Sequence, residues 1–152
     1  MHPAIKKALD QAGISYREIV HEALGVPIAG PADVAQALAI SLERITKTLF
    51  WVAKEPCFAV LSSSKRLDRT AVSTAAGAPC HAASRDKLEQ LVGYPPGSVS
   101  PLGTRDIPVF IDCDLLVFPT VLVGGGELGV EIELCPADLV RLTAATVLPL
   151  TR

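Results

Sequence analysis

Short apolar segments of two kinds occur along this chain, some with helical spacing and others with the alternation typical of strands. Ile5, Leu9 and Ala12 fall on one face of a helix and Gly13 is a natural stop, so the spacing predicts a helix over residues 3–12. Further helices are predicted from residues that favour a first turn. They begin at Pro31, after Asp68 (running to Ala76), after Ser84 (ending at Gly93) and at Pro136 (running to about Leu142), with a short helical turn over residues 41–44.

Strands are predicted where apolar and polar residues alternate, or where short runs of β-branched and aromatic residues occur. These segments are residues 15–20, 46–53, 57–62, 108–112, 120–123 and 129–134, with an edge strand over residues 145–150. Residues 21–30 are expected to form an irregular loop, and residues 114–118 fit either state. Because helices and hairpins are interspersed without strict βα alternation, the pattern predicts an α+β fold with a mixed, mostly antiparallel sheet flanked by short helices.

One loop, residues 93–103, holds three glycines and three prolines in eleven positions. Such a segment cannot form a helix or a central strand, because proline lacks the amide donor and glycine favours turns. Tyr94, Val99 and Leu102 give it apolar anchors, so its backbone groups can be held in place beside a small polar pocket. An ordinary surface connection is the alternative interpretation.

The composition indicates one apolar globular domain over residues 1–152, with 49% hydrophobic and 20% charged residues and no linker or repeat. No apolar run has the length of a membrane helix and no signal peptide is evident, so a cytoplasmic location without membrane contact is expected. The net charge of −2 argues against a grip on a long nucleic-acid duplex and allows only a short or local contact. Local basic candidates, which also fit solvated faces, are Lys6-Lys7, Arg44 with Lys47, Lys65-Arg66 with Arg69, and Arg85 with Lys87.

Several common chemistries lack their motifs. The four cysteines form no Cys-x-x-Cys pair, and three histidines are too few for a histidine-rich metal motif, so no metal site is expected. Phosphate-binding and dinucleotide-binding glycine motifs are absent, so an enzyme of this sequence is expected to work without a metal or redox cofactor. A thiol enzyme that uses Cys80, beside His81, or Cys113 remains an alternative.

Lys47 begins an apolar strand that is expected to lie centrally in the sheet, and it shares one strand face with Leu49 and Trp51. A lysine in this position either extends its ammonium into solvent at the strand end or is held beside a ligand. In the second case the ammonium can stabilise an oxyanion, which is a large contribution in acyl transfer.

Two segments together resemble the YbaK/EbsC family of free-standing aminoacyl-tRNA deacylases, which are related to the editing domain of bacterial prolyl-tRNA synthetase. They are Ile45-Thr46-Lys47-Thr48-Leu49-Phe50 and the loop from Gly93 to Gly103, and weaker matches extend over nearly the whole chain. The resemblance implies a compact α+β fold around a curved mixed sheet. It implies hydrolysis of the ester between an amino acid and the 3′ end of a mischarged tRNA, often tRNA(Pro), with prolyl-tRNA synthetase as a candidate partner.

The resemblance assigns the catalytic role to Lys47. It places substrate binding on the loop residues Gly97, Ser98, Val99, Ser100 and Pro101, on the late turn residues Gly124 and Gly125, on the acidic Glu131, and on His21 in a partly kept N-terminal segment. The chain departs from relatives in having Ser98 where many have a second glycine, Gly124 where some have serine, and Glu131 where some have aspartate. These differences bear on the amino-acid preference more than on the reaction.

The expected mechanism needs little covalent chemistry, because the ester is already activated. Lys47 would hold the terminal phosphate or the substrate carbonyl, the loop backbone would hold the amino acid, and water or a substrate hydroxyl would attack. Asp112, Asp114 and Glu131 are the candidates for a general base. Ser98 narrows the pocket and predicts a preference for alanine, serine or cysteine. A non-catalytic module that binds an amino acid or an aminoacyl-adenosine is the competing hypothesis.

Overall fold

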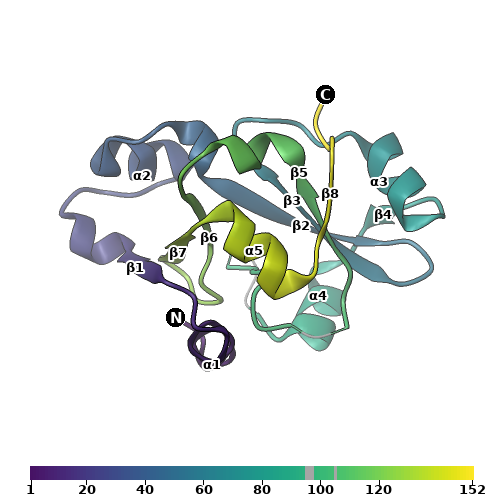
Figure 1. Ribbon diagram of the computed structural model, residues 1–152, viewed down its shortest axis with the longest axis horizontal. Helices are drawn as coiled ribbons and strands as arrows, with labels where there is room; N and C mark the ends of the chain where they lie inside the picture. The colour runs from purple at the N-terminus through teal and green to yellow at the C-terminus, as the bar shows by residue number, and fades with distance from the viewer. Residues whose placement is uncertain (95–97, 105) are drawn as a thin grey trace.

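The computed structural model describes residues 1–94, 98–104 and 106–152, and within them the strands form two sheets (Figure 1). The three-stranded sheet is antiparallel throughout, in the order β1 (Tyr16–Val20), β7 (Val130–Leu134), β6 (Val121–Gly124). The five-stranded sheet is mixed, in the order β4 (His81–Ala82), β2 (Thr46–Val52), β3 (Pro56–Ser62), β5 (Val109–Asp112), β8 (Thr146–Leu148). Its β3–β5 and β5–β8 pairs are parallel.

The two sheets meet where β2 begins. Ile45 and Leu122 form a parallel bridge, and the Thr46 hydroxyl donates a hydrogen bond to the Leu122 carbonyl oxygen at 2.7 Å. The predicted α+β class with mixed strand pairing is therefore confirmed, and the expected sheet is divided into two that are joined at this corner.

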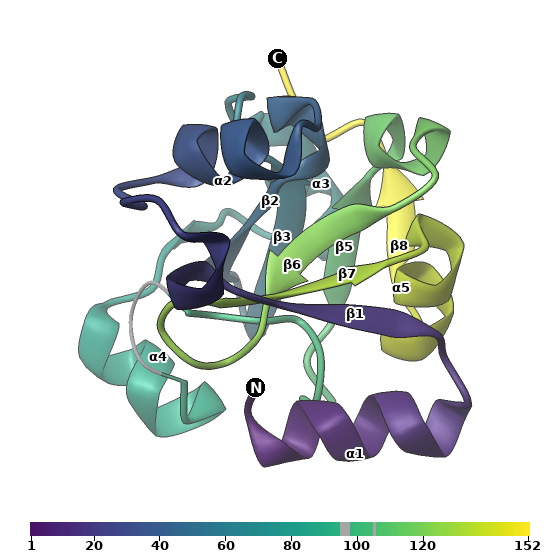
Figure 2. The same ribbon diagram turned by 90° about the vertical axis from the view of Figure 1, so that its left-hand side faces the viewer.

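Short helices cover the sheets (Figures 1 and 2). The α-helices are α1 (Pro3–Ala12), α2 (Pro31–Leu38), α3 (Arg69–Ala76), α4 (Arg85–Val92) and α5 (Pro136–Thr143), and the 3₁₀ helices are η1 (His21–Leu24), η2 (Leu42–Arg44) and η3 (Cys113–Val117). The predicted caps are present: the Asp68 carboxylate accepts from the amides of Thr70 and Ala71, and the Ser84 hydroxyl accepts from that of Lys87. No helix in the described ranges is long and apolar enough to cross a membrane.

Three apolar clusters hold these layers together. The largest packs the inner faces of both sheets against α1, whose Ile5 and Leu9 are fully buried. A second cluster seats α2 on the corner between the sheets through Val34 and Ala35, and a third seats α3 on the outer face of the five-stranded sheet through Val72. Each burial of a large aliphatic side chain contributes roughly 1.5–3 kcal/mol.

The structure differs from the predicted elements in small ways. Residues 21–24 form a 3₁₀ helix inside the expected irregular loop, and residues 113–117, which the pattern left open, form another. The two-residue strand β4 was not predicted; it is held by pairing with Trp51 and Val52 at the end of β2.

Candidate active site

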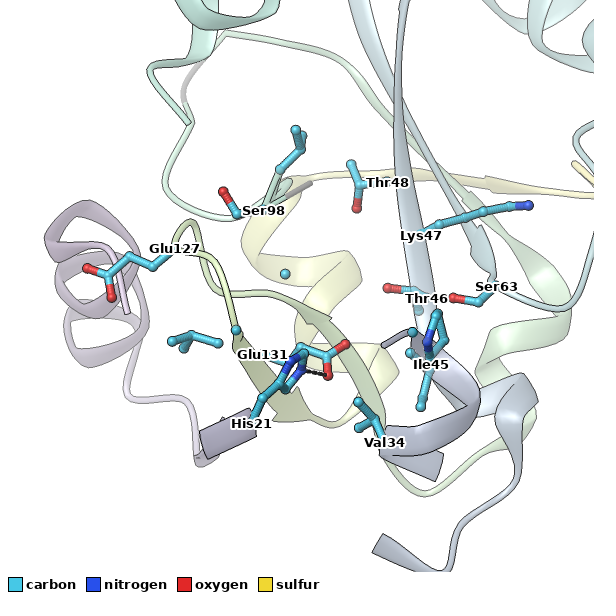
Figure 3. A pocket seen from close by; sticks show the side chains of 16 residues that line it. His21, Val34, Ile45, Thr46, Lys47, Thr48, Ser63, Ser98, Glu127 and Glu131 are labelled. Carbon is cyan, nitrogen blue, oxygen red and sulfur yellow. Dashed lines mark hydrogen bonds and ion pairs between the residues drawn. The ribbon is translucent and has the colours of Figure 1, made fainter. Parts of the chain in front are cut away.

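A cavity of about 360 Å³ opens where the start of β2, the turn between β6 and β7, η1 and α2 come together (Figure 3). It is lined by His21, Gly30, Pro31, Val34, Ile45, Thr46, Lys47, Thr48, Ser63, Ser98, Val99, Gly124, Glu127, Gly129, Val130 and Glu131. Six residues assigned by the sequence resemblance meet here although they come from five separate parts of the chain. They are His21, Lys47, Ser98, Val99, Gly124 and Glu131.

One wall of the cavity carries a hydrogen-bonded histidine and carboxylate. His21 directly follows β1, and its backbone amide donates to the carbonyl oxygen of Gly129 at 2.9 Å. This places His21 Nε2 at 2.9 Å from Glu131 Oε2, with side chains 27% and 15% exposed (Figure 3). The antiparallel pairing of β1 with β7 thus joins two residues 110 positions apart into one polar pair.

The opposite wall is the beginning of β2. Strand alternation turns Thr46 and Thr48 to one side and Lys47 to the other, the face that also carries Leu49 and Trp51. Lys47 is half-buried at the edge of the cavity, and its ammonium points away from His21 and Glu131 (Figure 3). No carboxylate among the described residues forms an ion pair with it, so the ammonium is available to an anion at the rim.

Thr48 is a lining residue that the sequence did not single out. Its Oγ1 is buried and finds no hydrogen-bond partner within the part of the chain that the structure describes. An unpaired buried hydroxyl costs roughly 1–3 kcal/mol, which a ligand group that bonds to it would recover. Pro31 and Val34 of α2 add an apolar side to the cavity that no local motif indicated.

Among the described residues of the glycine-proline loop, Ser98 and Val99 line the cavity. Ser98 and Val99 press against β6 so closely that a Cβ on Gly124 would lie 2.4 Å from the Val99 carbonyl oxygen. A glycine is required at position 124 because the two backbones touch.

Three further assigned residues, Ser100, Pro101 and Gly125, are not part of the cavity lining. Ser100 is fully buried and its hydroxyl accepts from the Leu102 amide at 3.1 Å, while Pro101 lines a separate groove beside α1. Gly125 donates its amide to the Val130 carbonyl oxygen at 2.8 Å and accepts from the His2 amide at 2.9 Å. These contacts shape the turn and loop that carry the lining residues; Gly97 lies outside the described residues.

The loop anchors behave as expected for structural residues. The Tyr94 hydroxyl is buried and donates to the Leu102 carbonyl oxygen at 2.7 Å, and burial raises the pKa of Tyr94 to about 12. Gly103, at a φ of 75°, packs so tightly on Tyr94 and α1 that a Cβ would lie 2.9 Å from the Tyr94 hydroxyl. The packing of Gly103 against α1 therefore holds this end of the loop in place.

Of the three candidate bases, only Glu131 lines this cavity. Asp112 and Asp114 border a different one beside η3, where Asp112 is buried and accepts a hydrogen bond from the Leu150 amide at 2.9 Å. Burial raises the pKa of the Asp112 carboxyl.

None of the four cysteines lines the cavity in its described part. Burial raises the pKa of the Cys57 thiol to about 11, and burial with the nearby Asp112 and Asp114 charges raises that of Cys113. The Cys113 thiol is therefore protonated and weakly nucleophilic at neutral pH, which argues against Cys113 as the nucleophile of a thiol enzyme.

Comparisons with known proteins identify this architecture. A family model described as an aminoacyl-tRNA editing domain matches residues 26–142, which is most of the chain. The chain belongs to the aminoacyl-tRNA editing domain family.

Individual relatives of this editing domain agree. It is 30% identical over 115 residues to a protein of Enterococcus faecalis named "Putative Cys-tRNA(Pro)/Cys-tRNA(Cys) deacylase EbsC", covering 73% of this chain and 70% of that protein. A crystal structure described as "a putative trans-editing enzyme for prolyl tRNA synthetase" superposes with a TM-score of 0.84 at 26% identity, covering 100% of this chain and 99% of the other. Another, of a hypothetical protein, superposes with a TM-score of 0.87 at 27% identity, covering 98% and 99%.

The lining of the editing domain suits a small ligand with charges at both ends. Carboxylates gather on the β7 side through Glu127 and Glu131, and the cation Lys47 stands at the β2 side. Among the described residues no group of three or more histidine, cysteine, aspartate or glutamate side chains is arranged to hold a metal ion.

Proposed function

We propose that this editing domain hydrolyses the ester of a small amino acid mistakenly attached to tRNA, with tRNA(Pro) as the substrate we expect. The observation that carries the proposal is the charge arrangement of the cavity, with the His21–Glu131 pair on one wall and Lys47 on the other. The aminoacylated 3′ end of a tRNA has the matching arrangement, with an α-ammonium on the amino acid and a phosphate on the 5′ side of the terminal adenosine. Family membership and the printed names of the relatives support the same reaction.

In this proposal each wall has a separate task. The Glu131 carboxylate, oriented by its hydrogen bond to His21, accepts a hydrogen bond from the α-ammonium of the amino acid. Lys47 holds the phosphate on the 5′ side of the terminal adenosine, and the Thr48 hydroxyl supplies a hydrogen bond to the substrate. Water adds to the ester carbonyl carbon and gives up a proton; the bond to the ribose oxygen then breaks, that oxygen takes up a proton, and the free amino acid leaves.

The size of the amino-acid side chain that the cavity admits is limited by Ser98, Val99 and Gly124. Their backbones are in contact, so this part of the cavity wall cannot move outward unless the loop separates from β6. A rigid wall rejects larger side chains strongly but cannot exclude smaller ones. We therefore expect hydrolysis of alanine, serine or cysteine esters, with the 3′ end of tRNA as the partner, prolyl-tRNA synthetase as a second one, and action in the cytoplasm where tRNA is charged.

The test is Lys47→Ala, with Lys54→Ala as the matched control. Lys54 is an exposed lysine at the far end of the same hairpin and does not line the cavity. We expect Lys47→Ala to slow single-turnover deacylation of mischarged tRNA by at least 100-fold, about 2.7 kcal/mol of barrier, and Lys54→Ala to leave it unchanged.

Thermal unfolding of both variants serves as the folding control. A Lys47→Ala rate within tenfold of the wild type, in a folded protein, would contradict the assignment. A wild-type protein that binds aminoacyl-adenosine without any turnover would instead favour the non-catalytic binding module.

A further inference from the structure

The start of α3 and the C-terminal residues lie on the same side of the molecule (Figures 1 and 2). Three exposed arginines belong to these segments, Arg66, Arg69 and Arg152. The Arg152 amide donates to the Arg66 carbonyl oxygen at 3.2 Å, and Leu67 bridges Thr151, so these two segments lie side by side. Arg69 opens α3, three residues after Arg66. None of the three arginines forms an ion pair with a carboxylate in the described ranges. Arg66, Arg69 and Arg152 are called the arginine face below.

The arginine face is connected to the cavity by two routes. Along the backbone, Ser63 lines the cavity and donates its amide to the Ile45 carbonyl oxygen at 2.7 Å, and the chain reaches Arg66 three residues later. Along β2, Lys47 and Trp51 share one face, and the Arg69 guanidinium lies 5.3 Å above the Trp51 ring. Four residues of strand span roughly 13 Å, so one cation, Lys47, lies at the cavity rim and a second, Arg69, lies at the other end of this strand face.

The other side of the cavity has the opposite charge. Glu127, paired with the Met1 ammonium at 2.9 Å, and Glu131, hydrogen-bonded to His21, line it there. Glu22 and Asp33 add carboxylates in the neighbouring η1 and α2. An RNA strand that left the cavity on this side would bring its phosphates close to carboxylates. The charge distribution therefore offers one exit that attracts phosphate and one that repels it.

We propose that the nucleotides next to the aminoacylated end of the tRNA leave the cavity past Lys47 and place their phosphates on the arginine face. This inference rests on the proposed function for its substrate and goes beyond it in assigning the RNA-binding surface. Arginine forms paired hydrogen bonds with phosphate, and stacking on Trp51 restricts the Arg69 side chain before RNA arrives. Although the whole protein has a net charge of −2, a local cluster of arginines can still bind a few RNA phosphates.

The experiment compares two triple variants with equal change in charge. The first is Arg66→Gln, Arg69→Gln and Arg152→Gln. The control is Lys6→Gln, Lys7→Gln and Arg141→Gln, which removes three exposed cations from α1 and α5. Binding of an unacylated tRNA(Pro) transcript is measured as a function of salt, and hydrolysis is measured on 3′-O-alanyl adenosine, which lacks the neighbouring phosphates.

We expect the arginine-face variant to bind the transcript at least tenfold more weakly than the control variant. Its slope of log affinity against log salt should be smaller by about 2 to 3, because each lost phosphate contact contributes about 0.7–0.9. Hydrolysis of 3′-O-alanyl adenosine should equal that of the wild type. Equal affinity and equal slope in the two variants, or no measurable tRNA binding by the wild type at low salt, would overturn the proposal.

The same measurements separate this proposal from the proposed function. If the wild type hydrolyses neither the small ester nor mischarged tRNA, but the arginine-face variant alone loses tRNA affinity, the surface stands and the reaction is wrong. If hydrolysis of the small ester is robust and both variants bind RNA alike, the reaction stands and the surface is wrong.

Discussion

Adding one methyl group at Gly124 tests whether the wall of the cavity is as rigid as its contacts indicate. A Cβ at this position would lie 2.4 Å from the Val99 carbonyl oxygen, 3.2 Å from the Val99 carbonyl carbon and 3.4 Å from the Ser98 carbonyl oxygen. All three atoms belong to backbone, so no side chain can rotate away. Either β6 or the loop must move.

The size of the movement follows from the shortest of these distances. A carbon–oxygen contact is comfortable at about 3.3–3.6 Å, so Gly124→Ala demands a separation of about 1 Å. Overpacking of this kind typically costs about 1–3 kcal/mol of unfolding free energy, which lowers the Tm of a protein of this size by about 2–12 °C. A shift of about 1 Å in a substrate-positioning segment can cost on the order of 100-fold in rate.

The assay measures Tm and kcat/KM for deacylation in Gly124→Ala and in Gly30→Ala. Gly30 also lines the cavity, but a Cβ there has nothing within 4 Å, and its φ of −169° is open to any residue. We expect Gly30→Ala to stay within threefold of the wild-type rate, whereas Gly124→Ala loses at least 30-fold. Wild-type Tm and rate in Gly124→Ala would refute the idea of a wall fixed by backbone contact.

Three further predictions concern single residues. Ser98→Gly should widen the pocket, so that esters of side chains larger than cysteine are hydrolysed at least tenfold faster than by the wild type; an unchanged substrate profile would remove Ser98 from selectivity. Asp112→Asn should become progressively more stable relative to the wild type as pH rises from 4 to 7 in urea unfolding, because burial raises the Asp112 pKa and the stability held by the protonated acid is lost as the carboxyl ionises. An unchanged difference across this range would contradict that origin. Cys80→Ala and Cys113→Ala should keep wild-type turnover, and loss of activity in either folded variant would revive the thiol-enzyme alternative.

The elements with strong end signals could be predicted from sequence alone. Asp68 and Ser84 cap α3 and α4 as expected, since capping depends only on residues within one helical turn. Strand β4 could not be predicted, because two exposed residues carry no pattern and owe their conformation to pairing with Trp51 and Val52.

At the site too, features that depend on neighbouring residues could be predicted, whereas those that depend on residues distant in the sequence could not. Alternation correctly places Lys47 on the face of Leu49 and Trp51, but only the structure shows that this directs the ammonium away from Glu131. Motif membership did not separate the loop residues that line the cavity from those that support it. Ser100 lies two residues after Ser98, yet its hydroxyl is occupied within the loop by the Leu102 amide.

The pairing of β1 with β7 sets a condition on when the protein can begin to work. During synthesis the Tyr16–Val20 segment emerges early, but the strand that completes its sheet ends only at Leu134. The His21–Glu131 hydrogen bond can form only after Glu131 has been synthesised, 110 residues after His21. At 5–20 residues per second this interval is about 6–22 s of translation. Until β7 has been made, β1 has no strand to pair with and the cavity lacks the Glu131 carboxylate, although most of its other lining residues are already present.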